Sequence, residues 1–230
     1  MFDKLRRKAR RAVKRVAGDA VDDEAERQTD RLVSKARSQA QHQIDESVDA
    51  RAAAMKGMKV SKKISGEIIT DFNKFKASWG KKAKDPVQSV FHFLIAALHY
   101  SKDKEIGGSM VTVILSKKHN IKDSSSPSGL KLGPTNRRLL NHMSEDPNIS
   151  KSYLGANYKE DYKFNEKKLV MGLIVSEVDD KYANVVIQSG GKDFPTPVSL
   201  ARNKDGQWKI TEFSSIATGC RKPASVEDDF

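Results

Sequence analysis

The sequence predicts an α+β fold, in which a helical layer packs on a C-terminal antiparallel sheet of about four strands, preceded by a long basic helix. Three observations support this prediction. Lysine and arginine dominate the first sixteen residues, apolar residues then recur every three or four positions as far as Met143, and the last third is rich in β-branched and aromatic residues between turn signals. The chain therefore divides into a basic helical extension (1–57), an α+β globular domain (58–223) and an acidic tail (224–230).

The first predicted element is an amphipathic segment that carries a concentrated positive charge. Residues 1–16 contain eight basic residues and one acidic residue, a net charge of +7 in a chain whose total is +12. No proline precedes Pro86, so we expect one long helix over residues 3–56, or two helices separated near Gly18. The apolar stripe of its first turns consists of Phe2, Leu5, Ala9, Ala12 and Val16.

The order of charges in this segment suggests a partner. Basic residues at the start of a helix oppose the helix macrodipole by ~0.3–1 kcal/mol each, and an anionic partner would compensate. An anionic membrane interface or a larger protein assembly fits best, whereas nucleic acid fits less well because Phe2 is the one aromatic residue in the extension. A solvated helix face, or self-association as a coiled coil, remains an alternative. The residues expected to contact an anionic partner are Phe2, Lys4, Leu5, Arg6, Arg7, Arg10, Arg11 and Lys14.

The predicted domain begins with a stretch that fits two kinds of element. Apolar residues between Val60 and Trp79 step by three and four, which favours a helix. Gly66 weakens this pattern, and residues 60–69 also fit a β-strand. Both assignments stay open for residues 60–69.

The centre of the domain is predicted to be one strongly apolar helix. Residues 87–100 form the most apolar segment of the chain, and Asp85-Pro86 before them provides a helix N-cap and a proline for the first turn. Fourteen residues are too few to span a bilayer, so we expect a buried core helix.

Two shorter segments connect this helix to the strands. Residues 110–115 are apolar and follow Gly107-Gly108, which we interpret as turn glycines. Residues 123–129 (DSSSPSG) are predicted to be an exposed loop. A short helix is then expected after Gly133-Pro134, with its inward-facing side chains at Leu139, Leu140 and Met143.

The last third of the chain has the pattern of a strand meander. Asp205-Gly206 between two strand-like segments is its strongest hairpin signal. Pro195 and Pro197 cannot donate to a sheet ladder, so their strand is expected to begin at an edge or a bulge. The predicted strands are residues 169–175, 182–188, 196–202 and 207–213.

From about residue 79 to residue 223 the chain resembles an uncharacterised bacterial domain family. The resemblance implies a pair of apolar helices with a C-terminal antiparallel sheet, and no reaction or ligand is assigned to that family. The stretch after Ala156 is shorter and more charged than the family pattern, and residues 1–57 lie outside it. The matching pieces are Asp85-Pro86-Val87, Ala96 to Tyr100, Ser152 to Ala156, Ser189 to Pro195 leading into a PxPVxL pattern that ends at Leu200, Gly206-Gln207-Trp208, Glu212 to Ser215, and Gly219 with Arg221, Lys222 and Pro223.

No motif of a known reaction is present, and we expect a non-enzymatic protein without a cofactor or a metal site. His92 and His99 fall seven residues apart on one predicted helix face and could form a pocket with Tyr153 and Trp208, although core packing explains all four equally well. Metal-binding histidines on a helix are normally three or four residues apart, which disfavours a metal site.

The chain has a single cysteine, Cys220, which excludes an intramolecular disulfide. Arg221 and Lys222 stand beside it, a setting that favours a lowered thiol pKa. A packed small residue is the alternative interpretation of this cysteine.

These patterns favour a binding or adaptor protein whose basic N-terminal helix docks the globular domain on an anionic membrane surface or a larger protein assembly. The alternative is a cargo or effector of a specialised bacterial secretion or injection system, with the N-terminal helix as its loading signal. The chain has no apolar run of about 18 residues and no apolar stretch of a Sec-type signal. We therefore expect a cytoplasmic protein, with peripheral membrane association or export by another route as alternatives.

Overall fold

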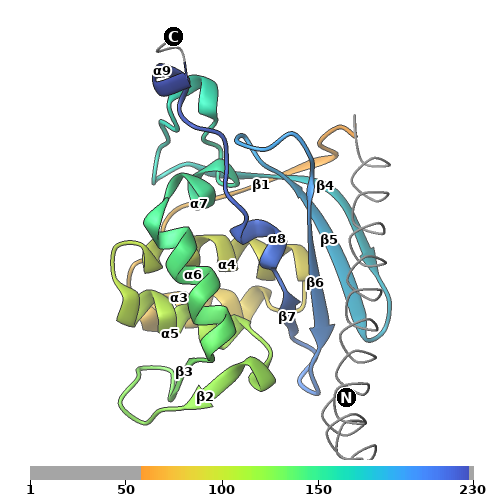
Figure 1. Cartoon of the computed structure of the whole chain (residues 1–230). Helices are drawn as coiled ribbons and strands as arrows, with labels where there is room; N and C mark the ends of the chain where they lie inside the picture. Colours follow the sequence, from red (N-terminus) through yellow and green to blue (C-terminus); the bar gives the residue numbers. More distant parts are fainter. Residues whose placement is uncertain (1–57, 228–230) are drawn as a thin grey trace, which may run out of the picture. The chain divides into compact units, whose positions relative to one another are not determined.

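A five-stranded antiparallel sheet with helices on one face makes up the body of the domain (Figure 1). The computed structural model describes residues 58–227, so the helix predicted within residues 1–57 and the last three residues of the predicted tail lie outside the described range. The strand order is β1-β4-β5-β6-β7. The strands are β1 Lys62–Gly66, β4 Leu169–Val178, β5 Tyr182–Gln188, β6 Thr196–Arg202 and β7 Trp208–Glu212.

The helices come mainly from the segment between β1 and β4. A short two-stranded ribbon, β2 Asn120–Lys122 with β3 Leu130–Leu132, connects α5 to α6 and encloses the loop predicted at residues 123–129. The helices are α3 Phe72–Lys82, α4 Pro86–Tyr100, α5 Lys104–Ile114, α6 Pro134–Glu145, α7 Asn148–Ser152, α8 Ser214–Ala217 and α9 Ala224–Glu227, with 3-10 turns η1 Lys117–His119 and η2 Tyr158–Glu160.

Helix α4 is the buried core helix that the sequence predicts. Asp85 is its N-cap and accepts a hydrogen bond from the Val87 N–H at 2.8 Å, and Pro86 occupies the first turn, where a missing N–H costs nothing. Every residue of α4 except Gln88 is buried. It packs against α3, α5, α6 and α7 and against strands β4, β5 and β7, so helices and sheet enclose it from all sides.

The sheet buries the face that its alternating residues predict. Val185 of β5 pairs with Val198 of β6, and Ala183 pairs with Leu200, and all four belong to the hydrophobic core. The β6–β7 turn lies at Asp205-Gly206 as expected, with Gly206 at a φ of 75°, a conformation that glycine adopts without strain. The structure thus confirms the α+β class.

The structure decides between the helix and the strand that the sequence left open for residues 60–69. Residues 62–66 form strand β1 and not the start of a helix, and α3 begins only at Phe72. β1 pairs with β4 and places Ile64 opposite Met171, which buries Ile64 and leaves its neighbours exposed. The sheet therefore has five strands instead of about four, because a distant strand, β4, supplies the partner of β1.

Gly107 and Gly108 lie inside α5 and are not turn glycines. A Cβ added to Gly107 would lie 2.4 Å from the backbone of Tyr100, the last residue of α4. Gly107 is therefore needed for the close approach of two helices, a role that the helix-breaking tendency of glycine conceals in the sequence.

Pro197, the second residue of β6, lies where this strand is paired on one side only. Pro197 pairs with Val186 of β5, whereas β7 reaches β6 only as far as Ser199. The beginning of this interior strand therefore has a neighbour on one side, which explains how a residue without an N–H is accommodated.

No helix within residues 58–227 combines the length and the apolar composition that a membrane crossing requires.

A pair of glycine substitutions tests the contact between α4 and α5. Gly107→Ala should lower the free energy of unfolding by about 1–3 kcal/mol, because the new methyl group meets backbone that cannot move aside. Gly80→Ala is the matched control within α3, where a Cβ meets nothing within 4 Å, and it should raise the free energy of unfolding by about 0.5–1 kcal/mol. Urea denaturation measures both, and equal effects would contradict the packing argument.

Candidate functional site

His92 and His99 are separate core residues in the structure. The His92 side chain is 2% exposed; its Nδ1–H donates to the Gln88 carbonyl at 2.7 Å and its Nε2 accepts from the Ser78 hydroxyl at 3.1 Å. Burial lowers the pKa of His92, so the ring is neutral, which is the state that these two hydrogen bonds require. His99 is 7% exposed, its Nδ1 has no partner among the described residues, and burial lowers its pKa as well.

The other two predicted pocket residues are also buried. Tyr153 is 1% exposed and its hydroxyl shares a 2.8 Å hydrogen bond with Thr196. Trp208 is 3% exposed, and its backbone N–H donates to the Ala83 carbonyl at 2.7 Å. Tyr153 lines a cavity of about 400 Å³ between the segment that follows α7, strand β4 and the end of β5, and its lining includes none of the other three. The structure therefore does not bring the four side chains together in this cavity.

Cys220 has a different environment from the one expected. Its thiol is half-buried and donates to the Asp146 carboxylate at 3.5 Å. Burial raises the pKa of Cys220, and the Asp146 charge raises it further, so the expected lowering by neighbouring basic residues is wrong. Arg221 is engaged elsewhere, because its guanidinium pairs with the Asp193 carboxylate at 2.8 Å.

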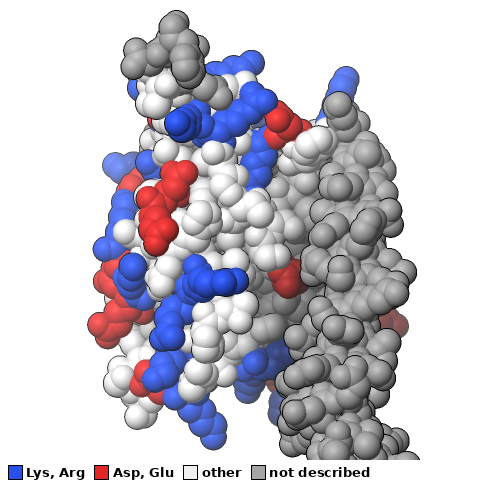
Figure 2. Space-filling view, in the orientation of Figure 1, with Lys and Arg blue, Asp and Glu red and all other residues white. Residues whose placement is uncertain are grey.

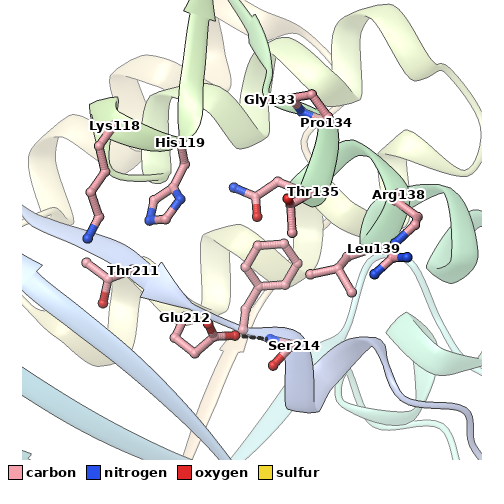
Figure 3. A pocket seen from close by; sticks show the side chains of 12 residues that line it. Lys118, His119, Gly133, Pro134, Thr135, Arg138, Leu139, Thr211, Glu212 and Ser214 are labelled. Carbon is pink, nitrogen blue, oxygen red and sulfur yellow. Dashed lines mark hydrogen bonds between the residues drawn. The ribbon is translucent and has the colours of Figure 1, made fainter. Parts of the chain in front are cut away.

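A second cavity, which we call the α6 pocket, opens between the N-terminus of α6, the η1 turn and the end of β7 (Figure 3). Its volume is about 440 Å³. Figure 3 shows Lys118, His119 and Thr211 on one side and Arg138 and Leu139 on the opposite side. The lining residues are Lys118, His119, Gly133, Pro134, Thr135, Asn136, Arg138, Leu139, Thr211, Glu212, Phe213 and Ser214.

Gly133 fixes the start of α6 against the η1 turn. Its N–H donates to the His119 carbonyl at 3.0 Å, and a Cβ at this position would lie 2.7 Å from the same oxygen. Pro134 follows as the first helical residue, with its φ preset for a helix. The sequence Gly-Pro thus places the helix N-terminus directly beside His119.

The first turn of α6 presents unused hydrogen-bond donors to the pocket. Gly133 has no side chain to cap the helix, and the N–H groups of Thr135 and Asn136 have no partner among the described residues. The Asn136 side chain is also without a hydrogen bond to any residue of 58–227, although Asn136 is only 9% exposed and lines the cavity. An uncapped helix start beside an amide that lines the cavity and has no hydrogen-bond partner among the described residues can bind an acceptor.

Charged side chains surround these donors. Lys118 and Arg138 line the pocket, and neither forms an ion pair within residues 58–227. Glu212 also lines it, with Oε1 accepting from the Ser214 N–H at 2.7 Å and thereby capping α8. Burial, then the Lys118 charge, lowers the pKa of His119, while Glu212 opposes this shift.

The sequence contains one signal for this site, the charge pattern at the start of α6. Helix α6 has no acidic residue in its first turn and carries Arg137 and Arg138 immediately after it. This arrangement opposes the helix dipole in the same way as the predicted helix at residues 1–16. The remaining walls, from η1 and β7, come from positions about 15 and 75 residues away, which no local pattern links to α6.

The comparisons with known proteins agree with the family resemblance in the sequence. The model of a family described as a domain of unknown function (DUF6935) matches residues 67–224. No curated protein and no solved structure matched the chain. The matched range includes the helical layer, strands β4 to β7 and the α6 pocket, and it excludes the basic residues 1–16.

Replacement of His92 tests whether its ring is buried and neutral in the folded protein. The unfolded chain takes up a proton on this ring near the ordinary pKa of 6.5, whereas the folded protein does so only at lower pH. Stability should therefore be unaffected by this group above that pKa and should fall as the pH drops below it. His92→Gln should make the loss of stability between about pH 7 and pH 5 smaller, measured by urea denaturation at each pH; a wild-type slope in the variant would contradict the assignment.

Proposed function

Because the chain belongs to the DUF6935 family and its most basic segment lies outside the matched residues, we propose that it is a non-enzymatic binding or adaptor protein. Its N-terminal residues dock the family domain on an anionic membrane surface or a larger protein assembly. The observation that carries the proposal is the net charge of +7 within residues 1–16, over half of the total of +12.

The position of this charge favours docking over a role inside the fold. The described domain has its own hydrophobic core, in which α4 is enclosed by residues of the 58–227 range. An amphipathic basic segment joined to such a body can insert Phe2 and Leu5 at a lipid interface while its arginines contact phosphates. Each basic side chain near an anionic surface contributes about 1 kcal/mol, so eight of them suffice for stable attachment.

The use of titratable groups within the domain supports binding over catalysis. His92 is hydrogen-bonded through both ring nitrogens inside the core, and Glu212 uses one oxygen to cap α8. Lys192 is likewise engaged, because its ammonium donates to the Ser215 carbonyl and to the Thr218 hydroxyl at 2.8 and 2.7 Å. These three groups are engaged in hydrogen bonds that hold the fold together.

Charge-neutralising variants of the full-length protein test the docking proposal. Replacing Arg6, Arg7, Arg10 and Arg11 together with glutamine should weaken binding to phosphatidylserine-containing vesicles by roughly a hundredfold or more, since about 1 kcal/mol is lost per charge. Vesicle co-sedimentation measures the binding, and thermal unfolding of the domain should be unchanged.

A matched control removes four charges from the described domain. Lys74, Lys81, Lys82 and Lys84 are exposed on and after α3, and their replacement by glutamine gives the same change of net charge. If this control loses as much binding as the arginine variant, overall charge and not the N-terminal segment drives attachment. Unchanged binding of a protein lacking residues 1–17 would also contradict the proposal.

A further inference from the structure

We propose that the α6 pocket is a binding site for a small organic phosphate monoester, with the phosphate at the N-terminus of α6 and the organic part over the apolar floor of the pocket. This inference goes beyond attachment through residues 1–17, because it concerns a site inside the family domain.

The helix start supplies the phosphate-binding backbone. Helix α6 has twelve residues, and the positive end of its dipole and the free N–H groups of Thr135 and Asn136 meet at the cavity. Aligned N–H groups at a helix N-terminus bind phosphate because they satisfy its oxygens without a side chain that must be desolvated.

Asn136 is the independent indication that the site has a ligand. Its side chain is nine-tenths buried, lines the cavity and has no hydrogen-bond partner within residues 58–227. Its amide atoms are not among the fully buried unpartnered atoms of the described residues, so they reach the open part of the cavity, where a ligand can form hydrogen bonds with them. A phosphate oxygen in the pocket can accept a hydrogen bond from the Asn136 side-chain N–H.

The surrounding charges favour a phosphate dianion over a monoanion. Arg138 from α6 and Lys118 from η1 stand on opposite sides of the cavity (Figure 3), and both are exposed at its rim. On the face shown in Figure 2, basic side chains over α6 border an uncharged surface. Two cations on either side of a helix N-terminus match the charge of a phosphate monoester.

The size and floor of the pocket call for more than an inorganic ion. A volume of about 440 Å³ is several times that of a phosphate group, and Phe213, Leu139 and Pro134 supply apolar contact beside the donors. Glu212 lies at the same pocket with one oxygen bonded to the Ser214 N–H, and its negative charge opposes a second anionic group on the ligand. A monoester with an uncharged organic part satisfies all of these groups.

Titration of the isotope-labelled full-length protein with phenyl phosphate tests the proposal. The amide signals of Thr135 and Asn136 should shift at saturating ligand, and phenyl phosphate should bind more tightly than inorganic phosphate or benzoate. The absence of shifts at these two amides up to about 10 mM phenyl phosphate would overturn the site. Equal affinity for benzoate would overturn the assignment to a phosphate.

Two variants separate a ligand site from general electrostatic attraction. Arg138→Gln should weaken phenyl phosphate binding by about tenfold or more, whereas Arg137→Gln, the adjacent exposed arginine outside the pocket lining, should change it little. Equal losses in the two variants would overturn the proposal.

Asn136→Leu tests whether the Asn136 amide binds the ligand or serves only the packing of α6. The substitution keeps the size of a largely buried side chain and removes only its amide, so it should change the melting temperature little while it weakens phenyl phosphate binding by about fivefold. Wild-type affinity in this variant would show that Asn136 does not serve the ligand and would overturn the argument built on it.

Discussion

An almost wholly apolar helix cannot leave any side in water, and this constraint on α4 determines the layout of the domain. Burial of α4 on one side requires the sheet, and burial on the others requires α3, α5, α6 and α7. Polar side chains of α4 also tie it to its neighbours; Ser89, for example, donates to the Trp208 carbonyl at 3.0 Å and accepts from the Trp79 indole at 3.3 Å. The helix thus connects to β7 through both apolar contacts and hydrogen bonds.

The α6 pocket is a consequence of the same constraint. Helix α6 covers α4 with Leu140 and Met143, both fully buried, and this packing fixes the direction of its axis. Its N-terminus then faces β7 and the η1 turn, where Gly133 allows the backbone to pass close to His119. The free donors of the first turn are therefore held in place by the core and not by a flexible loop, which favours binding without rearrangement.

Basic residues mark both the helix predicted at residues 1–16 and the observed start of α6, and these two signals were not equally visible in the sequence. In residues 1–16 the charge is so concentrated that composition reveals it without any structure. At α6 the signal is limited to the arginines that follow Gly-Pro-Thr-Asn, and it gains meaning only when Lys118 and an unpartnered Asn136 are found around the same cavity. His92 shows the opposite case, since spacing suggested a pocket and its hydrogen bonds place it in the core.

The sequence by itself determined the elements whose stability is local. The Asp85-Pro86 cap, the apolar length of α4, the Asp205-Gly206 turn and the alternation in β5 and β6 all depend on residues close together in the chain, and the family match rests on the same stretch. Tertiary structure decided the rest. Residues 62–66 form a strand because they pair with β4, which lies about a hundred residues further along the chain. Gly107 is required because the backbone of α4 lies against it. The α6 pocket is lined by three segments that are far apart in the sequence. These features depend on which surfaces meet after folding, and such contacts leave little trace in local periodicity or composition.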